Sequence, residues 1–296
     1  MSNMNASLSR KVFVVLNGLF FILLAVLCVY PLWYVLIQSL SSGNTGKAVF
    51  LPEGFTLDNY AQVFKMKNVA GALGISVLRT VVGTVCTVTA CMLLGYLFTK
   101  QDMPYRKFLY RMMIVTMYVS GGLIPTYLVI KSYGLLNNFW VYILPGVVSA
   151  YYVILTKTFI EQLPQAIEES AMIDGASPLT IFARIILPIS LPIVATISVY
   201  AAVSQWNSWF DNHMYALTNK KIMTLQYMLY KYLNEAERVA KEIKEMSDVN
   251  AASQAMLTPR GVRMTVTVIS VVPVLFVYPF LQRFFVKGIM IGAVKG

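Results

Sequence analysis

Charge is scarce in this sequence. Asp, Glu, Lys and Arg together make up 12% of its 296 residues, whereas a soluble domain spends about a quarter of its residues on charge. Hydrophobic residues account for 57%, and the mean hydropathy is +0.65. This composition excludes an ordinary soluble globular domain and predicts a protein that is solvated largely by lipid.

Residues that build catalytic and metal sites are also few. His213 is the single histidine, so neither a cluster of metal ligands nor a Ser-His-Asp arrangement can be assembled with ease. Cys28, Cys86 and Cys91 lie within apolar runs and lack metal-ligand spacing. No phosphate-binding G-x-x-x-x-G-K-[ST] motif occurs, because the nearest segment, residues 43–47, has the wrong spacing. We therefore predict no metal, no bound cofactor and no enzyme activity in this chain.

Long apolar runs supply most of the sequence. A helix needs about 20 apolar residues to cross the hydrocarbon of a bilayer. Six runs meet this length, over about residues 12–40, 72–98, 108–130, 139–160, 189–210 and 264–285. The first contains Pro31, where a kink is expected. The predicted fold is an all-α polytopic membrane protein, with six transmembrane helices in one domain over residues 1–296.

Basic residues outnumber acidic ones by 24 to 13, giving a net charge of +11. They are dispersed along the chain, so we predict no nucleic-acid binding. Short loops rich in Lys and Arg lie in the cytoplasm, and this rule places both termini there. That face holds Arg10, Lys11, Lys100, Arg106, Lys107, Lys157, Arg184, Arg283, Lys287 and Lys295, against Lys65, Lys67, Arg79 and Lys131 on the opposite face.

The longest polar stretch, residues 211–263, is predicted to be an external helical insertion. Apolar residues recur there at helical spacing from Leu225 to about Met246, which indicates an amphipathic helix. Two interpretations remain open: a cap that packs on the ends of the spans, or a docking surface for an external partner.

The connection over residues 163–188 contains signals for two short helices. Pro164 suits the first turn of a helix that ends at Ile173, because its missing N–H group would be unpaired there. Gly175 can adopt the left-handed conformation that ends this helix. Ser177 is a good N-cap for a second helix that runs to Pro188. The segment therefore predicts a helical hairpin on the cytoplasmic face.

The surface of this hairpin is predicted to bind a partner. We expect Ile167, Ala171 and Phe182 to be exposed beside acidic side chains, an arrangement that water alone does not favour. Glu169 can anchor an arginine of the partner through a bidentate pair.

The hairpin motif resembles the signature loop of binding-protein-dependent ABC importer permeases. The matching residues are Glu169, Ser170, Ala171, Gly175, Ile185, Leu187 and Pro188, and the fuller string with Asp174, Ala176, Phe182 and Pro192 is similar to the maltose-type group. Ser170 replaces the usual second alanine, one small residue for another. The C-terminal run over residues 278–296 resembles the lipoprotein and polysaccharide permease branch.

This resemblance implies a type I importer fold, in which the hairpin forms cytoplasmic coupling helices and Glu169 enters a groove on a separate ATPase subunit. The implied coupling residues are Glu168, Glu169, Ala171, Asp174, Gly175, Ala176, Phe182 and Pro188. The implied partners are a second homologous permease, two ATP-binding-cassette ATPase subunits that hold ATP and Mg, and an extracytoplasmic solute-binding protein. The cargo would be a carbohydrate, an oligosaccharide derived from a polysaccharide, carried across the bacterial cytoplasmic (inner) membrane. The tail, residues 288–296, either reaches the ATPase dimer interface or is a solvated end.

An ion-coupled secondary transporter or channel subunit is the alternative function, and a structural membrane anchor is a third. Secondary transporters carry ionisable groups buried in their spans and internal repeats. We expect Arg79 and Arg111 to lie near span ends, where their side chains can reach water. The two halves of the chain show no strong repeat, which favours the importer.

Substrate contacts are predicted where aromatic and hydrogen-bonding side chains gather. The end of the fifth span offers Gln205, Trp206, Asn207, Trp209 and Asp211, and the third and fourth spans add Tyr118, Tyr151 and Tyr152. The alternative for aromatic residues at a span end is an interfacial belt.

Overall fold

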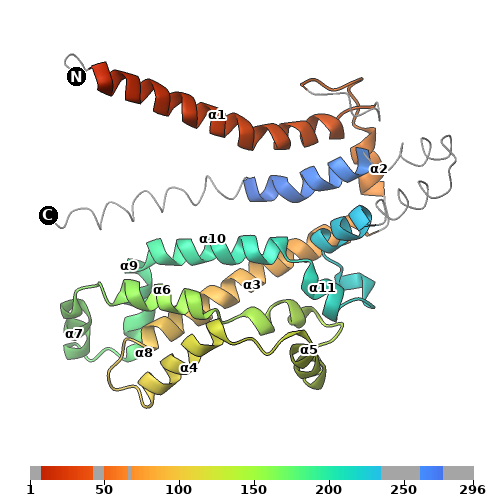
Figure 1. The fold of residues 1–296 in the computed structure, drawn as a ribbon. Helices are drawn as coiled ribbons and strands as arrows, with labels where there is room; N and C mark the ends of the chain where they lie inside the picture. The colour runs from red at the N-terminus through yellow and green to blue at the C-terminus, as the bar shows by residue number, and fades with distance from the viewer. Residues whose placement is uncertain (1–7, 43–49, 66–67, 235–260, 276–296) are drawn as a thin grey trace. The chain divides into compact units, whose positions relative to one another are not determined.

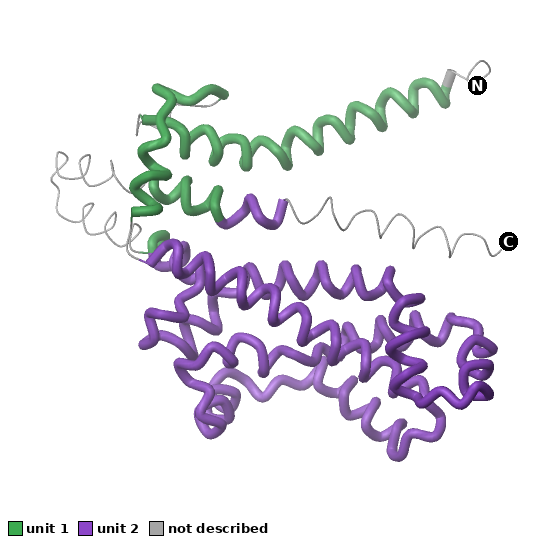
Figure 2. The backbone as a smooth tube through the Cα atoms, turned by 180° about the vertical axis from the view of Figure 1, so that it is seen from behind, with its two compact units in different colours: residues 1–67, 232–269 green, residues 68–231, 270–296 purple. Residues whose placement is uncertain are grey.

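The computed structural model describes residues 8–42, 50–65, 68–234 and 261–275, and these are largely helical, with no strand among them (Figure 1). An isolated β-bridge joins Ser41 and Phe55. The chain divides into two compact units, residues 1–67 with 232–269 and residues 68–231 with 270–296 (Figure 2). The predicted all-α fold class is confirmed.

The first unit contains α1 (Leu8–Ser39) and α2 (Asp58–Lys65). The α1 helix continues through Pro31 and is long and apolar enough to cross a membrane. Its C-terminal end is fastened to α2, because the Asn59 Nδ2 group donates to the carbonyl oxygens of Ser39 at 3.0 Å and Ser41 at 3.1 Å. These bonds satisfy carbonyl groups that a helix end leaves unpaired.

The second unit is built around α3 (Val69–Leu97), which packs against α6 (Ala150–Ile160) and α10 (Leu191–Asn207). These three helices lie side by side in Figure 1. Gly95 allows the close approach of α3 to α6, since a Cβ atom there would lie 2.5 Å from Thr156 Cγ2. The α3 helix is therefore the central element of this unit.

Two of the predicted spans are interrupted, contrary to the expectation of continuous helices. The third consists of α4 (Arg106–Tyr118) and α5 (Leu123–Ser132), separated at Gly121 and Gly122, and Gly122 has φ +83°. The fourth begins as η1 (Phe139–Tyr142) and η2 (Leu144–Gly146) and bends by 51° before α6. The fifth is the continuous helix α10, and an 81° bend separates it from the chain that precedes it, where Pro188 and Pro192 each lack the N–H group that a continuous helix needs.

Within the described residues, two helices, α1 and α3, can each cross a membrane alone, and up to four spans result if each bent pair counts as one. A shorter apolar helix, Gly261–Leu275, covers the start of the predicted sixth span. Residues 276–285 of that span and the tail at 288–296 lie outside the described residues. The count of six spans therefore stays a prediction.

The predicted external insertion starts with α11 (Phe210–Tyr215) and η4 (Lys220–Ile222). A helix then begins at Leu225, as predicted, and is described as far as residue 234. Leu225 and Met228 are buried, and the Leu225 N–H group donates to Ser76 Oγ at 2.8 Å. This start of the insertion packs against α3. Residues 235–260 lie outside the described part of the chain, so the choice between a cap and a docking surface stays open.

Candidate functional site

The hairpin folds through the local signals that its sequence carries. Its first helix is α7 (Gln165–Ile173), and Pro164 occupies the N-cap position, one residue before the predicted first turn. Gly175 has φ +79°, and the Ala176 N–H group donates to the Ala171 carbonyl at 3.0 Å, which closes the helix end. Ser177 Oγ accepts from the Thr180 N–H group at 3.3 Å and so caps the second helix, as predicted.

The second arm of the hairpin is less regular than predicted. It consists of α8 (Pro178–Ile181), a π-helical turn η3 (Phe182–Ile186) and α9 (Leu187–Ile189), and it leads into the 81° bend before α10. Pro188 lies in α9 and is exposed. Single π-helical turns inside α-helices are frequent at functional sites.

The expectation that Ile167, Ala171 and Phe182 form an exposed docking face is wrong. Ala171 is 8% exposed and belongs to a buried cluster with Tyr96, Ile160, Ile181 and Ile186, against which Phe182 also packs. The rings of Tyr96 and Phe182 are 5.2 Å apart, and Ile167 is half-buried. This face is turned inward because the end of α3, which is distant in sequence, supplies an apolar partner for it.

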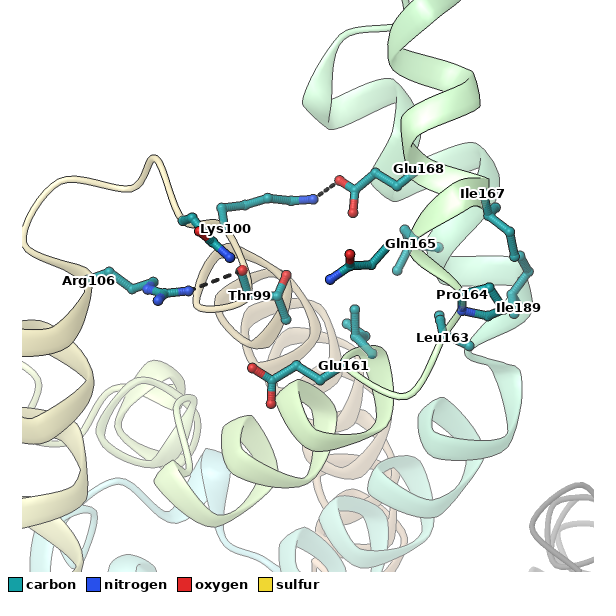
Figure 3. Close-up of a pocket in the computed structure, with 13 residues that line it drawn as sticks. Thr99, Lys100, Arg106, Glu161, Leu163, Pro164, Gln165, Ile167, Glu168 and Ile189 are labelled. Carbon is teal, nitrogen blue, oxygen red and sulfur yellow. Dashed lines mark hydrogen bonds and ion pairs between the residues drawn. The ribbon is translucent and has the colours of Figure 1, made fainter. Parts of the chain in front are cut away.

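Glu168 is also turned toward the rest of the chain. The Tyr96 hydroxyl donates to Glu168 Oε1 at 2.9 Å, and the Lys100 ammonium forms an ion pair with the same carboxylate (Figure 3). Lys100 Nζ also lies 4.1 Å from the centre of the Tyr96 ring. Burial lowers the pKa of Lys100. Glu168 thus fastens α7 to the C-terminal end of α3.

A cavity of about 270 Å³ lies between the hairpin and the segment that follows α3 (Figure 3). Lys100 and Arg106 line it on the side of that segment, Gln165 and Glu168 line it on the side of the hairpin, and Glu161 lines it at the end of α6. Among the residues drawn in Figure 3, the Lys100–Glu168 pair is the interaction that joins the two sides. The other marked bond runs from Arg106 to the Thr99 carbonyl at 3.2 Å, within the segment itself.

The exposed surface of the hairpin consists of residues other than the expected Ile167, Ala171 and Phe182. Glu169, Asp174 and Gly175 are exposed there, and Ala176 is half-buried. Ile173 is 86% exposed, Leu179 69% and Met172 50%. Sequence reasoning missed these three apolar side chains. Met172 and Ile173 remain exposed because the opposite side of α7 packs against Tyr96, and Leu179 is exposed on α8.

A second polar cluster surrounds Arg79, which corrects the expectation that this residue reaches water near a span end. Its side chain is 3% exposed and forms an ion pair with Asp211. Arg79 also donates to Gln205 Oε1 at 2.9 Å and to the Ser208 carbonyl at 3.1 Å, and its guanidinium lies 4.7 Å from the centre of the Tyr142 ring. The cluster ties α3 to the turn between α10 and α11. Gln205 and Asp211 are thereby engaged within the chain.

The remaining predicted substrate contacts are scattered. Trp206 is 6% exposed, and its indole N–H group donates to the Ser270 carbonyl at 2.8 Å. Trp209 stacks on Tyr230 with 3.9 Å between ring centres. Asn207 is exposed, and its Oδ1 atom accepts from Gln226 at 3.3 Å.

Three tyrosines of the predicted set keep exposed or partly exposed rings. Tyr118 is 84% exposed at the end of α4, and Tyr151 is 51% exposed at the start of α6. The ring of Tyr152 stacks on Tyr200, a residue of α10 that sequence reasoning missed, with 6.4 Å between ring centres and 11° between planes.

Residues 88–291 match the family of binding-protein-dependent transport system inner membrane components. This match covers more than half of the chain and includes the whole hairpin. The chain belongs to this family. This match confirms the family that the hairpin motif predicted. The hairpin of this inner membrane component lies within the matched residues.

Known relatives of this inner membrane component extend over nearly its full length. The polygalacturonan/rhamnogalacturonan transport system permease protein YtcP of Bacillus subtilis (strain 168) is 35% identical over 94% of this chain and 96% of its own. Protein LplC of the same strain is 36% identical over 99% and 98%. A chain from the crystal structure of a bacterial ABC transporter involved in the import of the acidic polysaccharide alginate superposes with TM-score 0.82 at 26% identity, covering 96% and 100%.

Proposed function

We propose that this chain is one of two permease subunits of an ATP-driven importer, and that it translocates an oligosaccharide derived from a polysaccharide. The observation that carries the proposal is the division of the hairpin into two faces. One face is fixed to α3 through Tyr96 and Glu168, while the other exposes Glu169, Ile173 and Leu179. An apolar and acidic surface of this kind fits a groove that contains a basic residue on a partner.

The partner at this surface is an ATP-binding-cassette ATPase, which holds ATP and Mg. The sequence of this chain lacks the phosphate-binding motif, so nucleotide must be bound by another subunit. Two ATPase subunits, a second homologous permease and an extracytoplasmic solute-binding protein complete the complex. The hairpin and both termini face the cytoplasm, which the distribution of Lys and Arg supports.

The proposed coupling surface differs in part from the set predicted by resemblance. Glu169, Asp174 and Gly175, with Ile173 and Leu179, contact the ATPase. Glu168, Ala171 and Phe182 hold the hairpin on α3, Ala176 packs beside them, and Pro188 sets the course of the chain into α10. Force applied at α7 therefore reaches α3 through Tyr96 and Lys100.

An oligosaccharide is proposed as cargo because the relatives named above include a permease for polygalacturonan and rhamnogalacturonan and an importer of alginate. The test uses the complete complex in vesicles and a panel of radiolabelled oligosaccharides prepared from pectin, alginate and starch. Uptake of at least one sugar should require ATP and the binding protein. Uptake that proceeds without ATP but collapses with the ion gradient would instead establish the secondary transporter.

The coupling surface has its own test in Glu169→Lys. This change sets a positive charge against the proposed basic groove, so the ATPase should co-purify poorly and uptake should be lost. Asp58→Lys makes the same change in charge on the exposed first turn of α2 and should retain both. Normal uptake by Glu169→Lys would remove the coupling assignment.

A further inference from the structure

One face of α10, a largely apolar helix, carries exposed polar side chains. Tyr200, Ser204 and Asn207 follow one another at spacings of four and three residues, which places them on the same side of the helix. All three are exposed, and Tyr200 is 50% exposed. In the described part of the chain, the Ser204 hydroxyl has no hydrogen-bond partner. Unpaired polar side chains are costly in hydrocarbon, which favours a protein or water environment for this face.

Aromatic rings from a second helix adjoin this face. Tyr152 of α6 lies nearly parallel to Tyr200, and Tyr151 lies 6.0 Å from Tyr152, ring centre to ring centre. Tyr152 is held in place because it packs against two buried clusters, one of Cys91, Phe98 and Val153 and the other of Met92, Ile193 and Ile197. Within the described residues, none of the three tyrosine hydroxyls has a hydrogen-bond partner. The rings are therefore positioned by packing while their polar groups remain available.

These rings lie near the middle of the fourth and fifth predicted spans. Tyr200 is nine residues from the start of α10, and Tyr151 is nine residues from the end of α6. At about 1.5 Å per residue, each lies about 14 Å from the hairpin end of its helix. With the hairpin ends at the edge of the hydrocarbon core, which is about 30 Å thick, both rings would lie near its midplane.

The backbone is irregular at the same depth. Residues 147–149, just before Tyr151, are not helical, and the chain bends by 51° there. Non-helical backbone within a membrane occurs only where protein buries it or where it lines a water-filled cavity. In secondary transporters, interrupted helices near the midplane line the substrate site. The polar face of α10 and this interruption thus indicate the same water-accessible path.

We propose that Tyr151, Tyr152 and Tyr200 form an aromatic subsite on which a sugar ring of the transported oligosaccharide stacks. This inference rests on the proposed function and adds to it the residues that touch the cargo. A pyranose ring has an apolar C–H face that fits an aromatic ring and hydroxyls at its edge that need hydrogen bonds. Tyr200 supplies the exposed ring, and the Ser204 and Asn207 side chains lie one and two helical turns further along the same face.

Variants of Tyr200 test this subsite in the complete reconstituted complex. The cargo is the oligosaccharide that the wild-type complex imports fastest from the panel of pectin, alginate and starch fragments. Tyr200→Leu should slow ATP-dependent uptake by about tenfold, because a stacked aromatic contact is lost. Tyr200→Phe keeps the ring and should stay within about threefold of the wild type. Tyr133→Leu removes another exposed tyrosine, just after α5, and should leave uptake unchanged.

A photoreactive benzophenone side chain in place of Tyr200 identifies what lies against this face. Light-induced crosslinking to the radiolabelled oligosaccharide, dependent on ATP and the binding protein, supports the subsite. Crosslinking to the second permease or to lipid, with wild-type uptake by Tyr200→Leu, overturns the subsite and leaves the importer intact. If the wild-type complex imports no oligosaccharide of the panel with ATP, the proposed cargo fails and the subsite fails with it.

Discussion

Replacing Glu168 by alanine tests whether the hairpin is fastened to α3 as the structure shows. The Tyr96 hydroxyl, on a residue that is 1% exposed, would lose its charged acceptor, and Lys100 would lose its ion-pair partner. A hydrogen bond to a charged group contributes about 1.5–3 kcal/mol. The Glu168 and Lys100 side chains are 20% and 22% exposed, so water screens part of their attraction. We therefore expect a loss of about 1.5–2 kcal/mol in the free energy of unfolding.

Two companion variants separate the contributions. Glu168→Gln keeps an acceptor for the Tyr96 hydroxyl but removes the charge, so its loss should be about half as large. Glu169→Ala alters an exposed neighbour and should change the free energy of unfolding by less than about 0.5 kcal/mol. The measurement is equilibrium unfolding of the purified subunit in detergent, followed by tryptophan fluorescence. Equal losses for Glu168→Ala and Glu169→Ala would refute the assignment of Glu168 to the interior.

Three further changes probe the rest of the second unit by the same unfolding measurement. Arg79→Met should lower the free energy of unfolding by about 3–5 kcal/mol because it leaves Asp211 without its partner. The double change Arg79→Met with Asp211→Leu should recover part of this loss, and no recovery would contradict the pairing. Gly95→Val should lower the free energy of unfolding by about 1–3 kcal/mol because the added side chain meets Thr156 on α6. A neutral effect would show that α3 and α6 are not in close contact. Ser177→Ala should cost about 1 kcal/mol by removing an N-cap, whereas Ser177→Asp should retain stability.

The turn chemistry of the hairpin could be predicted from sequence because it is local. Gly175 and Ser177 act through their own backbone and through residues a few positions away, so the ends of both arms follow from the residues themselves. The orientation of the hairpin could not be predicted in the same way. Which face of α7 is buried depends on Tyr96, which lies 72 residues from Glu168 in the chain.

The environment of Arg79 could not be predicted from sequence either, because its partner Asp211 lies 132 residues away. Hydropathy shows that one basic residue can be tolerated in a long apolar run but not how it is neutralised. The break in the third span is different, because Gly121, Gly122 and Pro125 are signals that the sequence does contain. The length of the apolar run outweighed these residues in the prediction of a continuous helix.

The α3 helix links the two ends of the second unit. Tyr96 joins it to the hairpin, and Arg79, 17 residues earlier, joins it to the turn after α10. At about 1.5 Å per residue these attachments are about 26 Å apart along one continuous helix. We therefore expect a displacement of the hairpin to move α3 as a rod and to pull on α10 through the Arg79 cluster. Since α10 carries Tyr200 while α6 carries Tyr151 and Tyr152, the same displacement should change the geometry of the aromatic rings that we place against the cargo.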